Sequence, residues 1–280
     1  VRNEADVLLV LGSRIGETDW WGKAPYWNPN QKVIQVDLDP SILGANKPTE
    51  VSILSDVKIF LEKLYQRLLP FKDQLNYLQR EALLSKYLED KQKHRDKLNE
   101  HLNDHATPMN SAHIPAICSE VFPKESPLVI DGGNTAIWTN FYYKVTEPGT
   151  VISTFKFGML GAGVGQALGA AAAKPDVPVC CIIGDGAMGF HPQEIETAVR
   201  NGLHIIYIVL CDRQWGMVKI NQHIAMKPIK TLIKKTLSPE ESINTDLGNI
   251  NFQQLAESMG AHGEYANNPN EFREALERSI

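Results

Sequence analysis

The sequence predicts an α/β fold in which parallel sheets carry helices on both faces. Apolar runs of strand length alternate with segments of helical character, and this alternation is typical of parallel sheets. Three of the apolar runs lead directly into the loops DGGNT, GDGAM and CDRQWGM. Because ligands of such sheets bind at the carboxyl ends of the strands, we expect the functional site in these three loops.

Residues 1–70 are predicted to be the end of one α/β domain. The apolar run VLLVLG at residues 7–12 predicts a strand buried on both faces, and residues 32–39 predict a second strand stopped by Pro40. Ser55 is expected to cap the helix that follows. The chain opens on Val1 with no targeting signal, and we expect it to be part of a longer polypeptide.

Residues 71–107 differ in character from what precedes them. Charged and amide side chains dominate there, with leucine and tyrosine thinly spread. This composition predicts a solvated helical linker between two domains. Pro108 marks its end.

Residues 108–280 predict a second α/β domain. Strands are expected at PLVID, GTVIST, VPVCCIIGDG and HIIYIVLCD. HPQEIETAVRNG predicts a helix with Pro192 in its first turn and Gly202 past its end. Residues 224–249 lack periodicity, and the sequence leaves open whether they form a mobile loop near the site or a plain surface connection. Two short helices, at residues 252–259 and 270–280, close the chain.

Composition and charge exclude several classes of protein. The formal charge of −5 provides no basic surface for nucleic acid. The apolar stretch at residues 157–173 falls short of the roughly 20 residues that a membrane span needs, so no membrane segment is expected. The four cysteines form no C-x-x-C pair, which favours reduced thiols and a cytoplasmic location. The histidines show no ligand spacing for zinc.

Asp185 lies between two glycines at the end of an apolar strand. Alone, GDG is consistent with two structures. It can be a turn whose aspartate caps a helix, or a loop whose carboxylate binds a metal and whose N–H groups bind phosphate. Asp212 favours the second, because residues 187–211 hold one helix and one strand and so return it to the same edge of the sheet. These carboxylates, with the backbone carbonyl of Gln214, form a ligand set suited to Mg²⁺.

Spacing and context together resemble a known family. GDG followed at this distance by an Asn/Asp pair is the thiamine diphosphate signature, and GDGAMGFHPQEIETAVRNGLHIIYIVLCDRQWGMVK resembles the acetolactate synthase branch of the thiamine-diphosphate enzymes. ADVLLVLGSRI and KVIQVDLDP resemble the end of that family's central domain. The resemblance covers nearly the whole chain. It implies that residues 108–280 are the diphosphate-binding domain and residues 1–70 the C-terminal part of the central domain.

The resemblance implies how the cofactor's diphosphate is held. Mg²⁺ would be ligated by Asp185, Asp212 and the Gln214 carbonyl. The backbone N–H groups of Gly186 and Ala187 would bind the diphosphate directly. Asn134 and Thr135, in DGGNT, would close on it from the other side.

For GMLG at residues 158–161, the resemblance implies contact with the aminopyrimidine ring. Gly158 would offer its carbonyl to the 4′-amino group, and Leu160 its N–H to a ring nitrogen. The Leu160 side chain would also serve catalysis by supporting the cofactor's V shape, with ordinary core packing as the alternative. The remaining implied cofactor contacts are Trp215, Gly216 and Met217.

Some positions depart from the family pattern or stay open. Cys211 replaces the first Asn of the usual pair and Asp212 the second, which keeps an oxygen ligand and adds charge. Leu160 stands where acetolactate synthases usually carry Met. Met217 and Val218 would line the pocket for a second substrate, with plain helix packing as the alternative.

The resemblance implies the cofactors thiamine diphosphate and Mg²⁺. FAD is left open and is not predicted: Arg14 and Asp37 stand where some relatives hold it, but no phosphate-binding loop accompanies them. The implied activity is decarboxylation of a 2-oxo acid with carboligation, as in a transferase or lyase. The alternatives are 2-oxo-acid decarboxylation alone, 2-hydroxyacyl-CoA cleavage by the same family, and a non-catalytic α/β subunit.

The family's catalytic glutamate comes from an N-terminal pyrimidine-binding domain, and nothing in this sequence matches that domain. We therefore expect the glutamate outside this chain, in a missing part of the polypeptide or in another subunit. The resemblance implies a homodimer or homotetramer.

Overall fold

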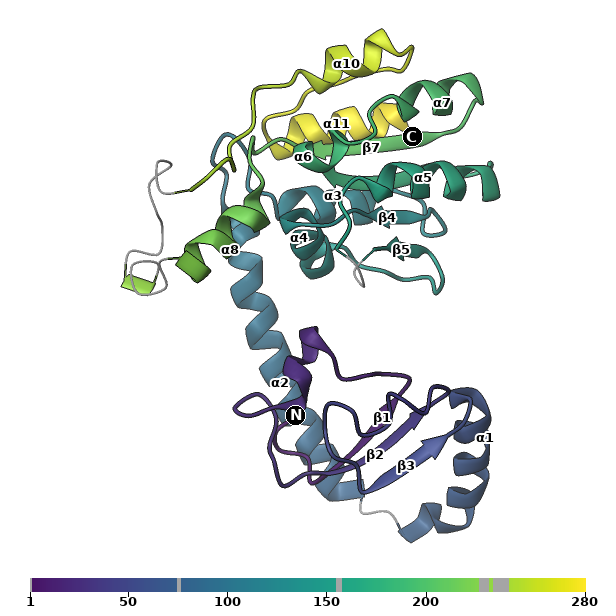
Figure 1. The fold of residues 1–280 in the computed structure, drawn as a ribbon. Coiled ribbons are helices and arrows are strands. Elements are labelled where there is room, and N and C mark those ends of the chain that lie inside the picture. The colour runs from purple at the N-terminus through teal and green to yellow at the C-terminus, as the bar shows by residue number, and fades with distance from the viewer. Residues whose placement is uncertain (1, 75–76, 155–157, 227–231, 234–241) are drawn as a thin grey trace. The chain divides into compact units, whose positions relative to one another are not determined.

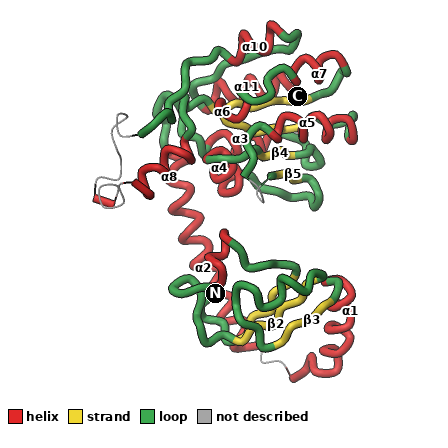
Figure 2. The backbone as a smooth tube through the Cα atoms, viewed as in Figure 1, coloured by secondary structure: helices red, strands yellow, loops and turns green. Residues whose placement is uncertain are grey.

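The chain folds into two compact units, Val1–His94 and Arg95–Ile280. The computed structural model describes residues 2–74, 77–154, 158–226, 232–233 and 242–280. In each unit the strands form a layer flanked by helices (Figures 1 and 2). The predicted α/β fold with parallel sheets is therefore confirmed.

The first unit contains a three-stranded parallel sheet. Its strands β1 (Val7–Leu11), β2 (Lys32–Asp37) and β3 (Val51–Leu54) lie in the order β1-β2-β3, and α1 (Val57–Leu68) follows. β2 ends three residues before Pro40, the residue expected to stop it. The middle strand carries the core of this sheet, because Val33 and Val36 are fully buried.

The prediction that β1 is buried on both faces is wrong. Val7 is 49% and Leu9 42% exposed. These two side chains point to the same face because side chains alternate along a strand. Among the described residues, that face of β1 stays open to solvent.

The predicted cap of α1 is wrong by one residue. Asp56 caps the helix: its carboxylate accepts hydrogen bonds from the N–H groups of Lys58 (2.9 Å) and Ile59 (3.1 Å). The Ser55 hydroxyl instead donates to the carbonyl of Asp56. Both residue types suit the position, and the sequence alone does not separate two neighbouring candidates.

The region expected to be a solvated helix contains α2 (Tyr77–Asn99), flanked by 3-10 helices at Leu69–Gln74 and Glu100–Asn103. Residues 75–76 of this region lie outside the described residues. Leu83, Leu84 and Leu88 are all exposed, so the helical and solvated character is confirmed. The boundary between the two compact units falls inside α2.

The second unit is built on a four-stranded, fully parallel sheet. The strands are β4 (Leu128–Ile130), β5 (Val151–Ser153), β6 (Val179–Gly184) and β7 (Ile205–Leu210). They lie in the order β5-β4-β6-β7 (Figure 1). All four expected strands are present.

Helices cover both faces of this sheet. On one face lie α5 (Ala162–Ala173), α6 (Asp185–Met188), α7 (Glu194–Arg200) and α10 (Phe252–Ser258), and on the other lie α3 (His113–Val121), α4 (Asn134–Tyr142) and α11 (Pro269–Ser279). α8 (Gly216–Met226) follows the loop after β7 and contributes to neither core cluster of the described residues.

Two separate apolar clusters form the core, one on each face. Cys181 and Ile183 of β6 pack with α5 and α7, whereas Cys180 and Ile182 pack with α3, α4 and α11. The alternation of side chains along one strand thus places neighbouring cysteines in different clusters. The continuous apolar run of β6 is explained by burial on both faces.

The predicted start of α7 is wrong. Pro192 lies before the helix, in a turn where its carbonyl accepts from the N–H of Ile195 (3.1 Å). Gly202 follows the helix with φ +62°, as expected of a glycine that ends a helix.

Of the irregular stretch at residues 224–249, residues 227–231 and 234–241 lie outside the described residues. No helix in the described part of the chain is long and apolar enough to cross a membrane.

The cysteines give a test of the fold. Cys118, Cys180 and Cys181 are buried and Cys211 is exposed, all as free thiols. Burial raises the pKa of the Cys180, Cys181 and Cys211 thiols, so access rather than thiolate formation separates Cys211 from the buried cysteines. In native protein, maleimide labelling followed by peptide mapping should modify Cys211 first, and the other three only after unfolding. Early modification of Cys180 or Cys181 would contradict the sheet described here.

Candidate functional site

Three strand ends bring the glycine-rich loops together. Gly184, the last residue of β6, is paired with Leu210, the last residue of β7, and Ile130 at the end of β4 is paired with Ile182. The loops after β4, β6 and β7 therefore start side by side at one edge of the sheet. This is the edge at which ligands of parallel sheets bind.

The loops enclose a cavity of about 440 Å³. Every residue that the sequence assigned to cofactor or metal lines it: Asn134, Thr135, Gly158, Leu160, Asp185, Gly186, Ala187, Asp212, Gln214, Trp215, Gly216 and Met217, together with Val218. The predicted residues, which range from Asn134 to Val218 in the chain, are thus gathered around one space.

The carboxylate of Asp185, which lines this cavity, is fixed by two backbone hydrogen bonds. Asp185 is 6% exposed and begins the short helix α6. One carboxylate oxygen accepts from the N–H of Gly186 and the other from the N–H of Arg213, both at 2.7 Å. The second bond ties the loop after β6 to the loop after β7, and it fixes the orientation of the carboxylate.

Asp212 lies close enough to Asp185 for the two carboxylates to interact electrostatically. Partial burial and, next, the Asp185 carboxylate raise the pKa of Asp212 above the usual value of an aspartate. Its Oδ1 accepts from the N–H of Gln214 at 3.2 Å. Two neighbouring carboxylates repel each other, and a divalent cation between them removes that repulsion.

The Gln214 carbonyl lies on the side of its loop where the Gln214 N–H meets Asp212. Residues 213–215 pair in antiparallel fashion with residues 245–247, through two backbone hydrogen bonds of 2.7 and 2.8 Å on either side of Gln214. Because N–H and C=O groups alternate in direction along an extended chain, the Gln214 carbonyl points away from residues 245–247. It faces the side on which its own N–H meets Asp212.

Two glycines allow these loops to approach closely. A Cβ on Gly186 would lie 2.7 Å from the Trp215 ring, so the indole covers the backbone there. A Cβ on Gly216 would lie 2.5 Å from the Asn134 amide nitrogen and 3.4 Å from an Asp212 oxygen. The segment after β4 thus reaches the part of the loop after β7 that carries Asp212.

The segment GMLG packs against the loop after β4. The Cδ2 atom of Leu160 lies 3.0 Å from the place where Gly132 would carry a Cβ, and the Gly158 carbonyl oxygen lies 3.5 Å from it. Gly158 has φ +60°, a left-handed conformation that favours glycine. The side chain of Leu160 therefore forms a wall between the two loops.

Asp131 organises both of these loops, and the sequence reasoning gave it no role. It is fully buried, and its carboxylate accepts from the N–H groups of Gly132 (2.7 Å), Gly161 (3.1 Å) and Gly163 (2.7 Å). The last two belong to the N-terminus of α5, whose partial positive charge favours a carboxylate. The signal was present: like Asp185, Asp131 follows a buried strand directly and precedes glycine.

The charges of the cavity limit what it can bind. Three carboxylates line it, those of Asp131, Asp185 and Asp212, and none of the described lining residues is Lys, Arg or His. Among the described residues, the contacts suited to a diphosphate are backbone N–H groups, and an accompanying cation would offset the charge of the carboxylates. The carboxylates of Asp185 and Asp212 and the Gln214 carbonyl are hard oxygen donors, and this donor set fits Mg²⁺.

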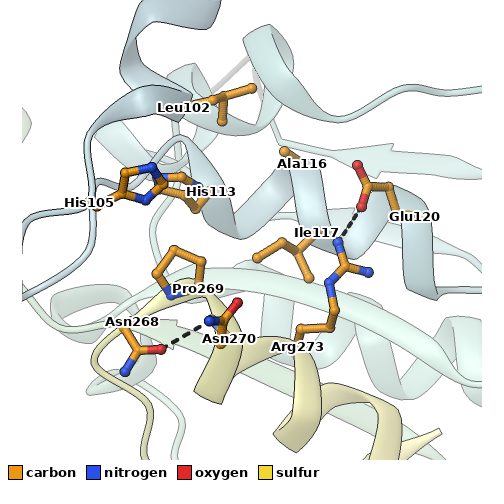
Figure 3. A pocket seen from close by; sticks show the side chains of 10 residues that line it. All are labelled: Leu102, His105, His113, Ala116, Ile117, Glu120, Asn268, Pro269, Asn270 and Arg273. Carbon is orange, nitrogen blue, oxygen red and sulfur yellow. Dashed lines mark hydrogen bonds and ion pairs between the residues drawn. The ribbon is translucent and has the colours of Figure 1, made fainter.

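Other parts of the described chain offer no comparable site. Groups of three or more His, Cys, Asp or Glu side chains suited to a metal are absent from the residues described. A larger hollow of about 610 Å³ lies between α3, α11 and the segment around His105 (Figure 3). There Arg273 pairs with Glu120, and the Asn268 side chain caps α11. None of the residues predicted for the site lines this hollow.

Comparison with known proteins identifies the family. The domain described as "Thiamine pyrophosphate enzyme, C-terminal TPP binding domain" matches residues 131–280. The domain described as "Thiamine pyrophosphate enzyme, central domain" matches residues 1–64. The chain belongs to the thiamine pyrophosphate (thiamine diphosphate) enzyme family, as the resemblance implied.

Relatives within the family differ in their reactions. The chain is 27% identical to a probable acetolactate synthase large subunit of Methanococcus aeolicus, over 99% of this chain and 45% of that protein. It is 28% identical to a sulfoacetaldehyde acetyltransferase of Alcaligenes xylosoxydans xylosoxydans and 27% identical to human 2-hydroxyacyl-CoA lyase 1, in each case over 99% of this chain and 47% of the relative. The chain spans about half the length of these relatives.

The structure also brings residues to the cavity that sequence reasoning missed. They are Ser111, Ile130, Gly132, Gly133, Ala136, Ile137, Trp138, Thr154, Gly184 and Leu210, besides Asp131. Most flank the predicted motifs, so their proximity in sequence was the available signal. Ser111 precedes α3, and nothing in its local sequence points to the site.

The hydrogen bonds of Asp131 lead us to expect different effects of the same substitution at two glycines of α5. A Cβ on Gly163 would lie 2.8 Å from the Asp131 carboxylate, whereas nothing lies within 4 Å of a Cβ on Gly165. Gly163→Ala should lower the free energy of unfolding by about 1–3 kcal/mol because it displaces a carboxylate held by three hydrogen bonds. Gly165→Ala in the same helix should be neutral or stabilise by up to about 1 kcal/mol. Equal effects in urea unfolding would contradict the role of Asp131.

Proposed function

We propose that this chain supplies the metal and diphosphate half of a thiamine diphosphate site for 2-oxo-acid decarboxylation with carboligation, in an acetolactate-synthase-like reaction. The observation that carries the proposal is the pair Asp185 and Asp212. Their strands end at paired residues, the Gln214 carbonyl points away from residues 245–247, and the surrounding cavity holds no cationic side chain among the described residues.

Different residues of the chain would bind the cation and the diphosphate. Asp185, Asp212 and the Gln214 carbonyl would hold Mg²⁺, which neutralises the diphosphate charge. The N–H groups at the start of α6, those of Gly186 and Ala187, would contact the diphosphate. In the structure the N–H of Gly186 donates to Asp185, and it would have to exchange this partner when diphosphate binds.

The segment GMLG, which lines the cavity with Gly158 and Leu160, would orient the reactive part of the cofactor. Thiamine diphosphate supplies the nucleophile and the electron sink of the reaction when it is bound. Gly158 and Leu160 would hold the aminopyrimidine ring, and the Leu160 side chain would support the cofactor's bent shape. Apolar atoms of Leu160, Trp215 and Met217 would exclude water from the reacting centre.

Other components of the site must come from outside this chain. We propose that an N-terminal pyrimidine-binding domain supplies the catalytic glutamate, from the same longer polypeptide or from another subunit of a homodimer or homotetramer. The fraction of each relative that the chain covers supports this. The free thiols of the described structure support a cytoplasmic protein.

A second candidate is a different reaction on the same cofactor. Relatives named for acetyl transfer and for 2-hydroxyacyl-CoA cleavage match at nearly the same identity as the acetolactate synthases. We favour the acetolactate-synthase-like reaction because of the matching segment around the metal loop. A non-catalytic subunit is the third candidate.

Removal of one metal ligand tests the binding function. In the full-length polypeptide, Asp185→Asn should weaken Mg²⁺-dependent binding of thiamine diphosphate by at least about 100-fold, because even outer-shell changes at metal sites cost 10–100-fold. Asp176→Asn, an exposed aspartate in a turn away from the cavity, is the matched control and should bind normally. Calorimetric titration measures both. Wild-type protein that binds no thiamine diphosphate would refute the proposal.

The product formed from pyruvate tests the reaction. Full-length protein supplied with thiamine diphosphate, Mg²⁺ and pyruvate should release CO₂ and form acetolactate, detected by chromatography. Acetaldehyde as the sole organic product would identify a simple decarboxylase. No turnover of pyruvate, with intact cofactor binding, would direct attention to the lyase and acetyl-transfer reactions.

A further inference from the structure

A short segment outside the cavity is fastened to the loop that carries Asp212. We call residues 243–247 the clasp segment and residues 212–215 the metal loop. The sequence left open whether the stretch containing the clasp segment lies near the site. Its described C-terminal part does, because the antiparallel bridge between Gln214 and Asp246 joins it directly to the metal loop.

Backbone hydrogen bonds join the two segments. The N–H of Trp215 donates to the Thr245 carbonyl at 2.7 Å, and the N–H of Leu247 donates to the Arg213 carbonyl at 2.8 Å. Thr245 is 1% exposed, whereas Arg213 and Asp246 are exposed, so the pairing is buried at Thr245 and open to solvent beside it. It also directs the Gln214 carbonyl away from the clasp segment.

Side chains of α8 hold the clasp segment from its other side. The Gln222 amide makes two bonds with the backbone of Ile243: its Nε2 donates to the carbonyl (3.0 Å) and its Oε1 accepts from the N–H (2.9 Å). Lys219 pairs with Asp246 at 2.9 Å, and the Lys219 side chain is only 17% exposed. None of these four residues lines the cavity.

The backbone of the paired segments needs such support. Arg213 has φ +56° and Asn244 has φ +51°, conformations that non-glycine residues seldom adopt. Such conformations persist only where surrounding contacts fix them. Arg213 is the residue whose N–H binds Asp185, so its conformation sets the relation between the two carboxylates.

We propose that the clasp segment positions the metal loop, so that the Gln222–Ile243 and Lys219–Asp246 contacts set how tightly the site holds its cation. The identity of that cation as Mg²⁺ rests on the proposed function. The positioning itself does not, because it concerns the backbone of the unliganded protein. Gln222, Lys219 and Asp246 are positioning residues that touch neither cation nor cofactor.

Hydrogen exchange on the metal-free, full-length protein tests the positioning. Gln222→Glu keeps the size of the side chain but places a carboxylate oxygen against the Ile243 carbonyl. The amides of Trp215 and Leu247 should then exchange at least about tenfold faster, since their protection depends on local opening, while the amides of β6 keep their protection. The control is Gln254→Glu, the same change at an exposed position of α10. Unchanged exchange at Trp215 and Leu247 would overturn the proposal.

Reversal of the ion pair tests the effect on the cation. In the presence of thiamine diphosphate, Lys219→Asp and Asp246→Lys should each weaken Mg²⁺ binding by about two- to fivefold, the range expected of a single ion pair near the surface. The double variant should recover the wild-type affinity, with little change in unfolding temperature throughout. Single variants that bind Mg²⁺ normally, or a double variant no better than either, would overturn the proposal.

The two kinds of failure are distinguishable. Wild-type protein that binds no Mg²⁺ contradicts the proposed function. Normal Mg²⁺ binding by wild type, together with unchanged exchange in Gln222→Glu, contradicts only the clasp.

Discussion

The site depends on the repulsion between two neighbouring carboxylates. The register of β6 and β7 ends both strands at paired residues, so Asp185 and Asp212 stand at one edge with no cationic side chain among the described lining residues. Partial burial and, next, the charge of Asp185 raise the pKa of Asp212. A divalent cation bound there, as proposed, would offset the repulsion and would allow a diphosphate to bind in a negatively charged cavity.

Other parts of the structure hold these charges in place without neutralising them. Asp131 fixes the start of α5 and the loop after β4 through three backbone N–H groups. Gly186 and Gly216 let the loops approach more closely than a side chain would allow. The clasp segment supports Arg213 in a strained conformation. Each device acts on the backbone, so the carboxylates stay available for a ligand.

The fold and the site could be predicted from sequence to different degrees. Long apolar runs such as β6 and β7 were predictable because burial on both faces leaves a continuous signal, and the distance between Asp185 and Asp212 followed from one helix and one strand between them. Boundaries were less predictable: Asp56 rather than Ser55 caps α1, and Pro192 precedes α7. The exposed face of β1 and the role of Asp131 depend on tertiary packing, which a local pattern does not contain.

The central claim is that a cation binds between Asp185, Asp212 and the Gln214 carbonyl. The most direct measurement is anomalous diffraction from crystals of the full-length protein grown with thiamine diphosphate and Mn²⁺ in place of Mg²⁺. The account predicts one strong peak at about 2.0–2.2 Å from oxygen atoms of all three residues, in the coordination range of such ions. Bound cofactor without a peak there, or a peak held by other residues, would contradict it.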